Sequence, residues 1–281
     1  MNPKVSESVA FNMLRACSFV VVAPVLLVLY FLISNGWTAM TWNFFTQMPR
    51  NGMSEGGILS PIIGTLYLMA GTAIVSLPLG LLSAIYLSEY AKPGPLMRLI
   101  RLAIVNLAGV PSIVYGLFGY AIFVLLVMHV ECILAGALTL SIMVLPVIIV
   151  AAEEALKTVP QSFREASLAL GATKWQTVRR VVIPNALPGI ITGGILGLSR
   201  AAGETAPILF TVAAFYMPNL PKSVFDKAMC LPYHLYIIST QVPDAPPRIQ
   251  WGTALTLLLI VLGMNIIAAI IRMQYRRKRA W

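Results

Sequence analysis

The stretch that decides the fold runs from Glu153 to Gly189 and reads EEALKTVPQSFREASLALGATKWQTVRRVVIPNALPG. Pro160 can open a helix, and Gly171 stands where a helix would end on a left-handed residue. Thr173 can cap a second helix, in which apolar residues recur at helical spacing, and the prolines that follow are expected to end it. The stretch therefore predicts two short amphipathic helices that meet at Gly171.

The rest of the chain is strongly apolar. Of its 281 residues, 58% are hydrophobic and only 11% are charged, and soluble domains carry about twice that charged fraction. The apolar residues come in runs of roughly 18 or more, long enough to cross a hydrocarbon core of about 30 Å. Six spans are expected, at about 16–34, 62–87, 102–128, 132–152, 186–213 and 251–271. The sequence predicts an all-α integral membrane protein with a single transmembrane domain over residues 1–281.

Three segments do not fit simple spans and turns. The region 102–128 is too long for one straight helix, so we expect a short interfacial helix before Gly109–Ser112 and a span after it. The segment 153–184 holds the two short helices described above. The segment 214–250 is rich in proline and carries an apolar patch, which fits a lid, a docking surface or irregular structure.

The basic residues set the expected orientation. The net charge is +10, and fifteen of the 20 Lys and Arg residues fall on one side of the six expected spans. The other side has four: Arg50, Lys222, Lys227 and Arg248. The positive-inside rule then places both termini in the cytoplasm, with the basic tail at 272–281 as an anchor on anionic lipid. No recognition motif accompanies the charge, so we expect no nucleic-acid partner.

Motifs for chemistry are missing from the sequence. No GxxxxGK[ST] loop occurs, so any ATP hydrolysis must come from a separate chain. His129 and His234 stand alone, the three cysteines are far apart, and no serine, histidine and carboxylate form an identifiable catalytic pattern. We therefore expect a protein that is not an enzyme and that has no cofactor or metal.

A row of small residues marks the fifth expected span. Gly189, Gly193 and Gly197 recur at every fourth position and let another helix approach closely. Packing within the chain and packing against a second membrane chain both fit this row. The contact with a second chain is the preferred interpretation.

The segment 153–184 resembles the cytoplasmic signature of membrane subunits in bacterial ABC importers. That signature is Glu-Ala-Ala, three residues, Gly, nine residues, then Ile-x-Leu-Pro. The chain keeps the spacing with Glu165-Ala166-Ser167, Gly171 and Val181-Val182-Ile183-Pro184, and departs from it only at Ser167, Val181 and Ile183. The resemblance implies a type I ABC importer permease fold and a coupling role for six residues. These are Glu165, Ala166, Gly171, Val181, Ile183 and Pro184.

Two further stretches resemble the permeases of phosphate importers, the PstA type. They are GVPSIVYGLFG at 109–119 and SRAAGETAPILFT at 199–211. The resemblance implies inorganic phosphate as the substrate. It also implies a second permease subunit, an ATPase subunit dimer and a phosphate-binding protein as partners. A permease for molybdate or sulfate is the alternative within transport, and a membrane scaffold or a polytopic enzyme is the alternative outside it.

Arg200 and Glu204 are charged residues within the fifth expected span. An unpaired arginine near the middle of a span costs at least about 2.5–3.5 kcal/mol, and a partner one helical turn away reduces that cost. An internal ion pair that fixes helix packing is one interpretation. The other, which we prefer, assigns Arg200, Glu204 and Thr205 to a water-accessible pathway, where a guanidinium suits phosphate oxygens. Pro207 fits either a hinge or a tolerated kink.

Overall fold

Helices build almost the whole chain. The structure is a computed structural model that describes residues 3–217, 219–243 and 245–278. The α-helices are α1 (Pro3–Gly36), α2 (Trp42–Thr46), α3 (Leu59–Ile85), α4 (Pro95–Ala108), α5 (Ser112–Gly119), α6 (Ile133–Lys157), α7 (Gln161–Ala169), α8 (Lys174–Thr177), α9 (Ile183–Gly203), α10 (Ala206–Thr211), α11 (Leu231–Thr240) and α12 (Pro247–Lys278). Short 3₁₀ turns are η1 (Trp37–Ala39) and η2 (Asn51–Met53), and short π-helices are η3 (Tyr86–Tyr90), η4 (Tyr120–Met128) and η5 (Val178–Val182). The strands β1 (Pro49–Arg50) and β2 (Glu55–Gly56) form an antiparallel hairpin.

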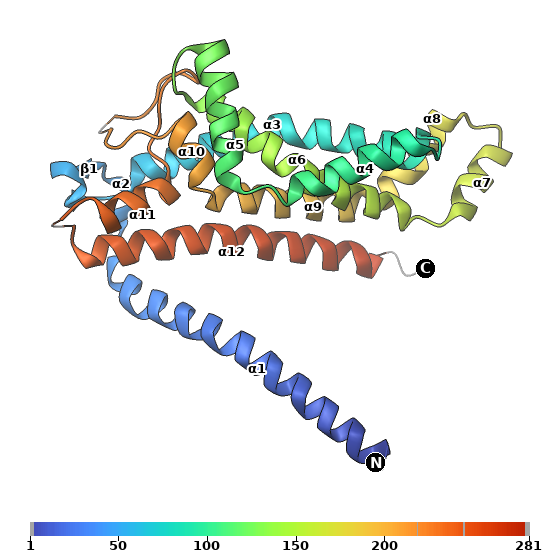
Figure 1. Cartoon of the computed structure of the whole chain (residues 1–281), viewed down its shortest axis with the longest axis horizontal. Helices are drawn as coiled ribbons and strands as arrows, with labels where there is room; N and C mark the ends of the chain where they lie inside the picture. Colours follow the sequence, from blue (N-terminus) through green and yellow to red (C-terminus); the bar gives the residue numbers. More distant parts are fainter. Residues whose placement is uncertain (1–2, 218, 244, 279–281) are drawn as a thin grey trace.

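Four long helices form the body of the molecule. α3, α6, α9 and α12 lie along one another, and α1 leaves this body from its contact with α12 (Figure 1). α6 is apolar on all sides because neighbours surround it, and Leu140, Met143 and Val144 are among its buried residues. Within the described residues, five helices are long and apolar enough to cross a membrane, or six if the bent pair described below is one broken span. The expected all-α membrane fold is confirmed.

The glycine row of α9 packs against α6 of the same chain. A Cβ placed on Gly193 would lie 2.4 Å from the Cβ of Ala151, and one placed on Gly189 would lie 2.6 Å from the Cβ of Ala155. Gly197 faces Ile148 in the same way. The preferred interpretation of these glycines as a contact with a second chain is therefore corrected, since helix packing within the chain uses this face.

The region 102–128 is broken at the expected place but runs differently from the expectation. Helix α4 ends at Ala108, α5 begins at Ser112, and the two directions differ by 101°. Pro111 has no N–H for a helix and disfavours helical backbone at the residue before it, which explains the break. Helix α4 runs along the long helices, whereas α5 turns across them (Figure 1). The helix before the break is therefore the one that runs parallel to the long helices, whereas the sequence predicted this for the helix after the break.

The region 186–213, expected as one span, is also two helices. Helix α9 ends at Gly203, Glu204 has extended backbone (φ −76°, ψ 134°), and α10 starts at Ala206. Pro207 lies in the first turn of α10, where its missing N–H is tolerated, but it cannot continue α9. The proline therefore marks a true helix break. Arg200 lies in the last turn of α9 and not in the middle of a span.

The segment 214–250 folds back onto the body. The later part of its apolar patch forms α11, in which Tyr233, His234 and Ile237 are buried. The N–H of Leu231 donates to the Thr65 hydroxyl of α3 at 2.9 Å. Much of the patch therefore belongs to the hydrophobic core. Only the residues on either side of α11 form a loop.

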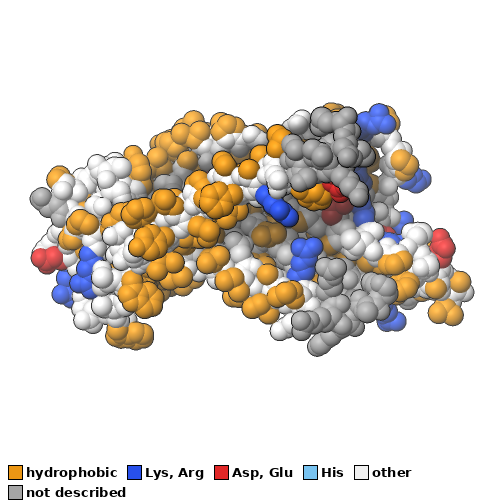
Figure 2. Space-filling model, turned by 90° about the horizontal axis from the view of Figure 1, so that it is seen from below, with side chains coloured by type: hydrophobic (Ala, Val, Ile, Leu, Met, Phe, Trp, Pro, Cys, Tyr) orange, Lys and Arg blue, Asp and Glu red, His pale blue; other side chains and the backbone are white. Residues whose placement is uncertain are grey.

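The surface agrees with a membrane-embedded body. Hydrophobic side chains cover the middle of the face in Figure 2, and most charged side chains on it lie toward the two ends. The basic tail expected at 272–281 continues α12 as far as Lys278, and residues 279–281 lie outside the described residues.

Candidate coupling and translocation sites

The first short helix and its boundary form as the sequence predicts. Helix α7 begins after Pro160, and Gly171 follows it with a φ of +81°, which favours glycine. Thr173 then caps α8: its hydroxyl accepts from the N–H of Gln176 at 3.3 Å, and its own N–H donates to the Gln176 side chain at 2.8 Å. This reciprocal capping box fixes the direction in which the chain leaves the turn.

The second short helix does not end where it was expected to. Helix α8 continues through η5 into α9 without a break, so residues 174–203 form one long helix. Pro184 sits in the first turn of α9, and Pro188 is accommodated inside it. The π-helical turn η5 immediately before Pro184 changes the hydrogen-bond spacing, which lets a proline follow without ending the helix. The segment 153–184 is therefore one short helix joined to the start of a long one.

The six expected coupling residues fall into two groups. Glu165, Ala166 and Gly171 are exposed, at the end of the molecule where α7 and α8 project (Figure 1). Val181, Ile183 and Pro184 are half-buried instead, and Ile183 packs on the apolar cluster formed by the ends of α3, α6 and η5. The first group can contact another protein, and the second group anchors the segment to the body.

Large apolar side chains are also exposed on this projection. Leu170 is 89% exposed, Trp175 52% and Leu168 48%. Trp175 is one of the apolar residues that recur at helical spacing after Thr173, whereas the exposure of the two leucines was not expected from the sequence.

Two ion pairs lie beneath the projection, and sequence reasoning missed both. Arg164 of α7 binds Glu89 of η3 with an Nη2–Oε1 distance of 2.7 Å, and both side chains are mostly buried. Arg101 of α4 pairs with Glu153 of α6 and also donates to the Leu87 carbonyl at 2.8 Å. The chain has only 10 acidic residues, so a carboxylate at the end of an apolar run was the signal for such pairs.

Arg200 and Glu204 form a loose and accessible pair. The distance from Arg200 Nε to Glu204 Oε1 is 3.5 Å, and the side chains are 41% and 18% exposed. In the described part of the chain we find no other hydrogen bond from the Arg200 guanidinium. Glu204 also lines a small internal space beside Thr65 of α3, which has room for about one water molecule. Most of the arginine donors are therefore available to a ligand.

The two stretches that resemble phosphate permeases meet at this pair. Gly116 of α5 lies against the backbone of Ala206 and Pro207 at the start of α10, so that a Cβ on Gly116 would be 2.9 Å from the Ala206 carbonyl oxygen. Tyr115 is buried near Arg200, and its hydroxyl donates to the Leu107 carbonyl at 2.8 Å. Thr205 is half-buried at the same break. Helix α5, which follows one helix break, therefore lies beside the second break and its accessible arginine.

Comparisons with known proteins agree with this architecture. The family model described as "Binding-protein-dependent transport system inner membrane component" matches residues 76–279. The chain is 37% identical to the phosphate transport system permease protein PstA 1 of Mycobacterium tuberculosis (strain CDC 1551 / Oshkosh), over 98% of this chain and 91% of that protein. It is 34% identical to the probable ABC transporter permease protein YqgI of Bacillus subtilis (strain 168), over 95% of each chain.

A solved structure shows the same fold. The MetNI methionine ABC transporter in inward-facing conformations aligns with a TM-score of 0.56 at 19% identity, covering 78% of this chain and 97% of that one. The fold is that of a type I ABC importer permease, as the sequence resemblance implied, in a multi-pass protein of the inner membrane. The chain belongs to the family of binding-protein-dependent transport system inner membrane components.

Proposed function

We propose that the chain is the permease subunit that carries inorganic phosphate through an ATP-driven importer. The accessible Arg200, at the meeting point of two broken helices, carries the proposal. Relatives that are named phosphate permeases support the choice of substrate. The pathway would form against a second permease subunit, with phosphate delivered by an external binding protein and energy supplied by an ATPase dimer.

The geometry of Arg200 suits transient binding of an anion. A guanidinium offers planar donors that match phosphate oxygens, and a dehydrated anion needs such donors on its way across. Glu204 contacts the guanidinium at the limit of hydrogen-bond distance, so it can neutralise the arginine between passages without occupying all its donors. A pair of this kind attracts phosphate without trapping it.

The projection formed by α7 and the start of α8 is the proposed docking site for the ATPase. Glu165, Ala166 and Gly171 are exposed there beside Leu170 and Trp175, which gives an apolar surface with a defined backbone turn. A short amphipathic helix of this kind fits a groove on a partner protein. We also propose that both termini are cytoplasmic. The start of α1 and the end of α12 lie toward the same end of the molecule as α7 and α8 (Figure 1), which supports this orientation.

Labelled-phosphate uptake tests the proposal. The complete transporter is reconstituted in vesicles with binding protein and ATP, and sulfate and molybdate serve as competitors. We expect Arg200→Gln to lower uptake by about 100-fold at unchanged expression, because the mutation removes the charged planar donors. Lys227→Gln is the matched control, since its pair with Glu131 also lies outside the coupling segment. Uptake at the wild-type rate in Arg200→Gln, or uptake suppressed equally by sulfate, would refute the assignment.

A further inference from the structure

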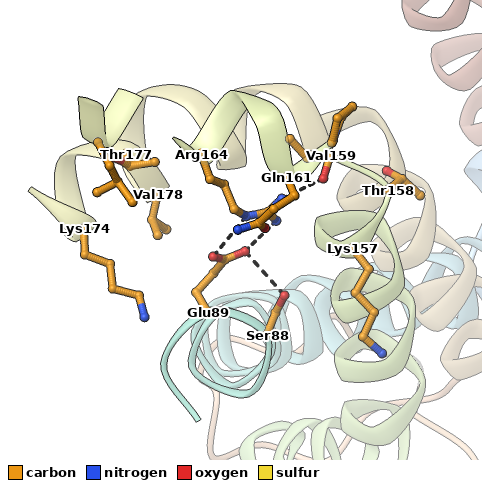
Figure 3. A pocket seen from close by; sticks show the side chains of 12 residues that line it. Ser88, Glu89, Lys157, Thr158, Val159, Gln161, Arg164, Lys174, Thr177 and Val178 are labelled. Carbon is orange, nitrogen blue, oxygen red and sulfur yellow. Dashed lines mark hydrogen bonds and ion pairs between the residues drawn. The ribbon is translucent and has the colours of Figure 1, made fainter. Parts of the chain in front are cut away.

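One residue of α7 connects this helix to two membrane helices at once. The Arg164 guanidinium donates to both carboxylate oxygens of Glu89, at 2.7 and 3.3 Å. It also donates to the carbonyls of Val159 at 2.6 Å and Leu156 at 3.0 Å, at the end of α6. Figure 3 shows Arg164 reaching across to Glu89, which rises from the helix that continues α3. Arg164 therefore ties α7 to the ends of both α3 and α6.

Around this pair, α7 and η3 are separated by a cavity and are not packed directly against each other. A cavity of about 610 Å³ lies between them, lined by residues of η3, the α6–α7 connection, α7 and α8, including Ser88, Gln161 and Lys174. Every residue of α7 is exposed or half-buried; Phe163 packs on the apolar cluster beneath, and the Ser167 hydroxyl lies 2.9 Å from that of the buried Thr177. Helix α7 thus has room to shift, and the ion pair is its direct polar connection to α3 across the gap (Figure 3).

The receiving element, η3, also contacts the helix that leads to the proposed pathway. Arg101 of α4 donates to the Leu87 carbonyl of η3 and pairs with Glu153 of α6. Helix α4 leads through the bend into α5, and Gly116 of α5 lies against the start of α10, next to Glu204. One-turn π-helices such as η3 often occur at functional sites. A continuous series of contacts therefore runs from α7 to the Arg200–Glu204 break.

We propose that the Arg164–Glu89 pair is the positioning link that passes movement of α7 to α3 and α4. The inference rests on the proposed function, because it assigns the movement of α7 to the ATPase. Both side chains are largely withdrawn from water, at 13% and 8% exposed, so the pair holds one geometry rather than exchanging with solvent. A link of this kind is needed to convert ATP hydrolysis into transport, and it is not needed to bind the ATPase, whose proposed contacts are on the exposed side of α7.

The ratio of phosphate transported to ATP hydrolysed is the measurement that tests the link. The full transporter is reconstituted with wild-type permease, with Glu89→Gln and with Glu89→Asp. Glu89→Gln keeps the shape of the side chain and an acceptor oxygen but removes the charge that fixes Arg164, so we expect the ratio to fall about tenfold with ATPase still bound. Glu89→Asp retains the charge and should keep the ratio within about threefold of wild type.

Glu154→Gln is the matched control. Glu154 is a carboxylate at the same end of the molecule, paired with Lys157 at 2.9 Å, but it is 66% exposed. The ratio should remain at the wild-type value in this variant, since an exposed pair contributes little. Arg164→Gln completes a double-mutant cycle, and the double variant should be no more uncoupled than Arg164→Gln alone.

Three outcomes would overturn the link. The first is a wild-type ratio in an assembled Glu89→Gln transporter. The second is additive loss in the cycle, and the third is failure of both single variants to assemble, which would make the pair purely structural. Failure of the proposed function is seen separately in the wild-type arm, as a transporter that does not take up phosphate or a permease that does not retain the ATPase.

Discussion

Gly193 offers the sharpest test of how α9 is held in the body. A methyl group at this position would lie 2.4 Å from the Cβ of Ala151 on α6. Carbon atoms in contact are normally about 3.5–4.0 Å apart, so Gly193→Ala requires the two helices to separate by roughly 1 Å or to shift along each other. The helices cannot do so at this point alone, because they are equally close one turn away, where a Cβ placed on Gly189 would lie 2.6 Å from the Cβ of Ala155.

The expected effect combines a clash and a helix preference. Overpacking of this kind costs about 1–3 kcal/mol, whereas alanine favours a helix over glycine by about 1 kcal/mol. Gly193→Ala alone should therefore lower the free energy of unfolding by about 0–2 kcal/mol. Ala151→Gly removes the opposing methyl group, so the double variant Ala151→Gly/Gly193→Ala should unfold close to wild type. The coupling energy between the two sites is then about 1–3 kcal/mol, which is the clash itself.

Equilibrium unfolding of the isolated permease in mixed detergent micelles measures these energies. The isolated chain is the right sample because the contact lies within one subunit. Gly263→Ala on α12 is the control: nothing lies within 4 Å of a Cβ there, so the change should stabilise the protein slightly. A coupling energy below about 0.5 kcal/mol, or stabilisation by Gly193→Ala equal to that by Gly263→Ala, would refute the packing argument.

Two further predictions follow from local chemistry. Thr173→Ala removes the capping box of α8 and should destabilise the permease by about 0.5–2 kcal/mol in the same unfolding assay, whereas Thr240→Ala, which removes no cap, should stay within about 0.5 kcal/mol. Burial lowers the pKa of His234 in α11 to about 4, and neither ring nitrogen has a partner among the described residues. Between pH 6.5 and 4 the unfolded chain is protonated first, so stability should fall with acid by about 3 kcal/mol, and His234→Leu should lose this part of the dependence.

Local signals in the sequence were enough to place the turn between α7 and α8. Pro160, Gly171 and Thr173 each have a distinct backbone preference, and the structure uses each one as expected. Signals of this kind act within a few residues and do not depend on the rest of the fold. The membrane-spanning helices could also be predicted from the apolar runs, because the thickness of a membrane sets the length of a spanning helix.

Features that depend on contacts between distant parts of the chain could not be predicted from the sequence in the same way. A row of glycines shows that a helix approaches closely but does not say which one, and α6 occupies that place. A proline gives a position for a break but not its consequence: Pro188 stays inside α9, whereas Pro207 begins a new helix. The difference lies in the neighbouring backbone, since Glu204 is already extended before Pro207.

The Arg164–Glu89 and Arg200–Glu204 pairs also show why charge in this chain has to be interpreted through its geometry. Arg164 makes four hydrogen bonds, to Glu89 and to two carbonyls, and only 13% of its side chain is exposed, so few donors remain for a ligand. Arg200 makes one long contact and is 41% exposed. A saturated, buried pair resists rearrangement and can transmit force, whereas a loose, accessible pair can exchange its partner for an anion. The same two residue types thus suit opposite tasks at the two ends of the contact series from α7 to α10.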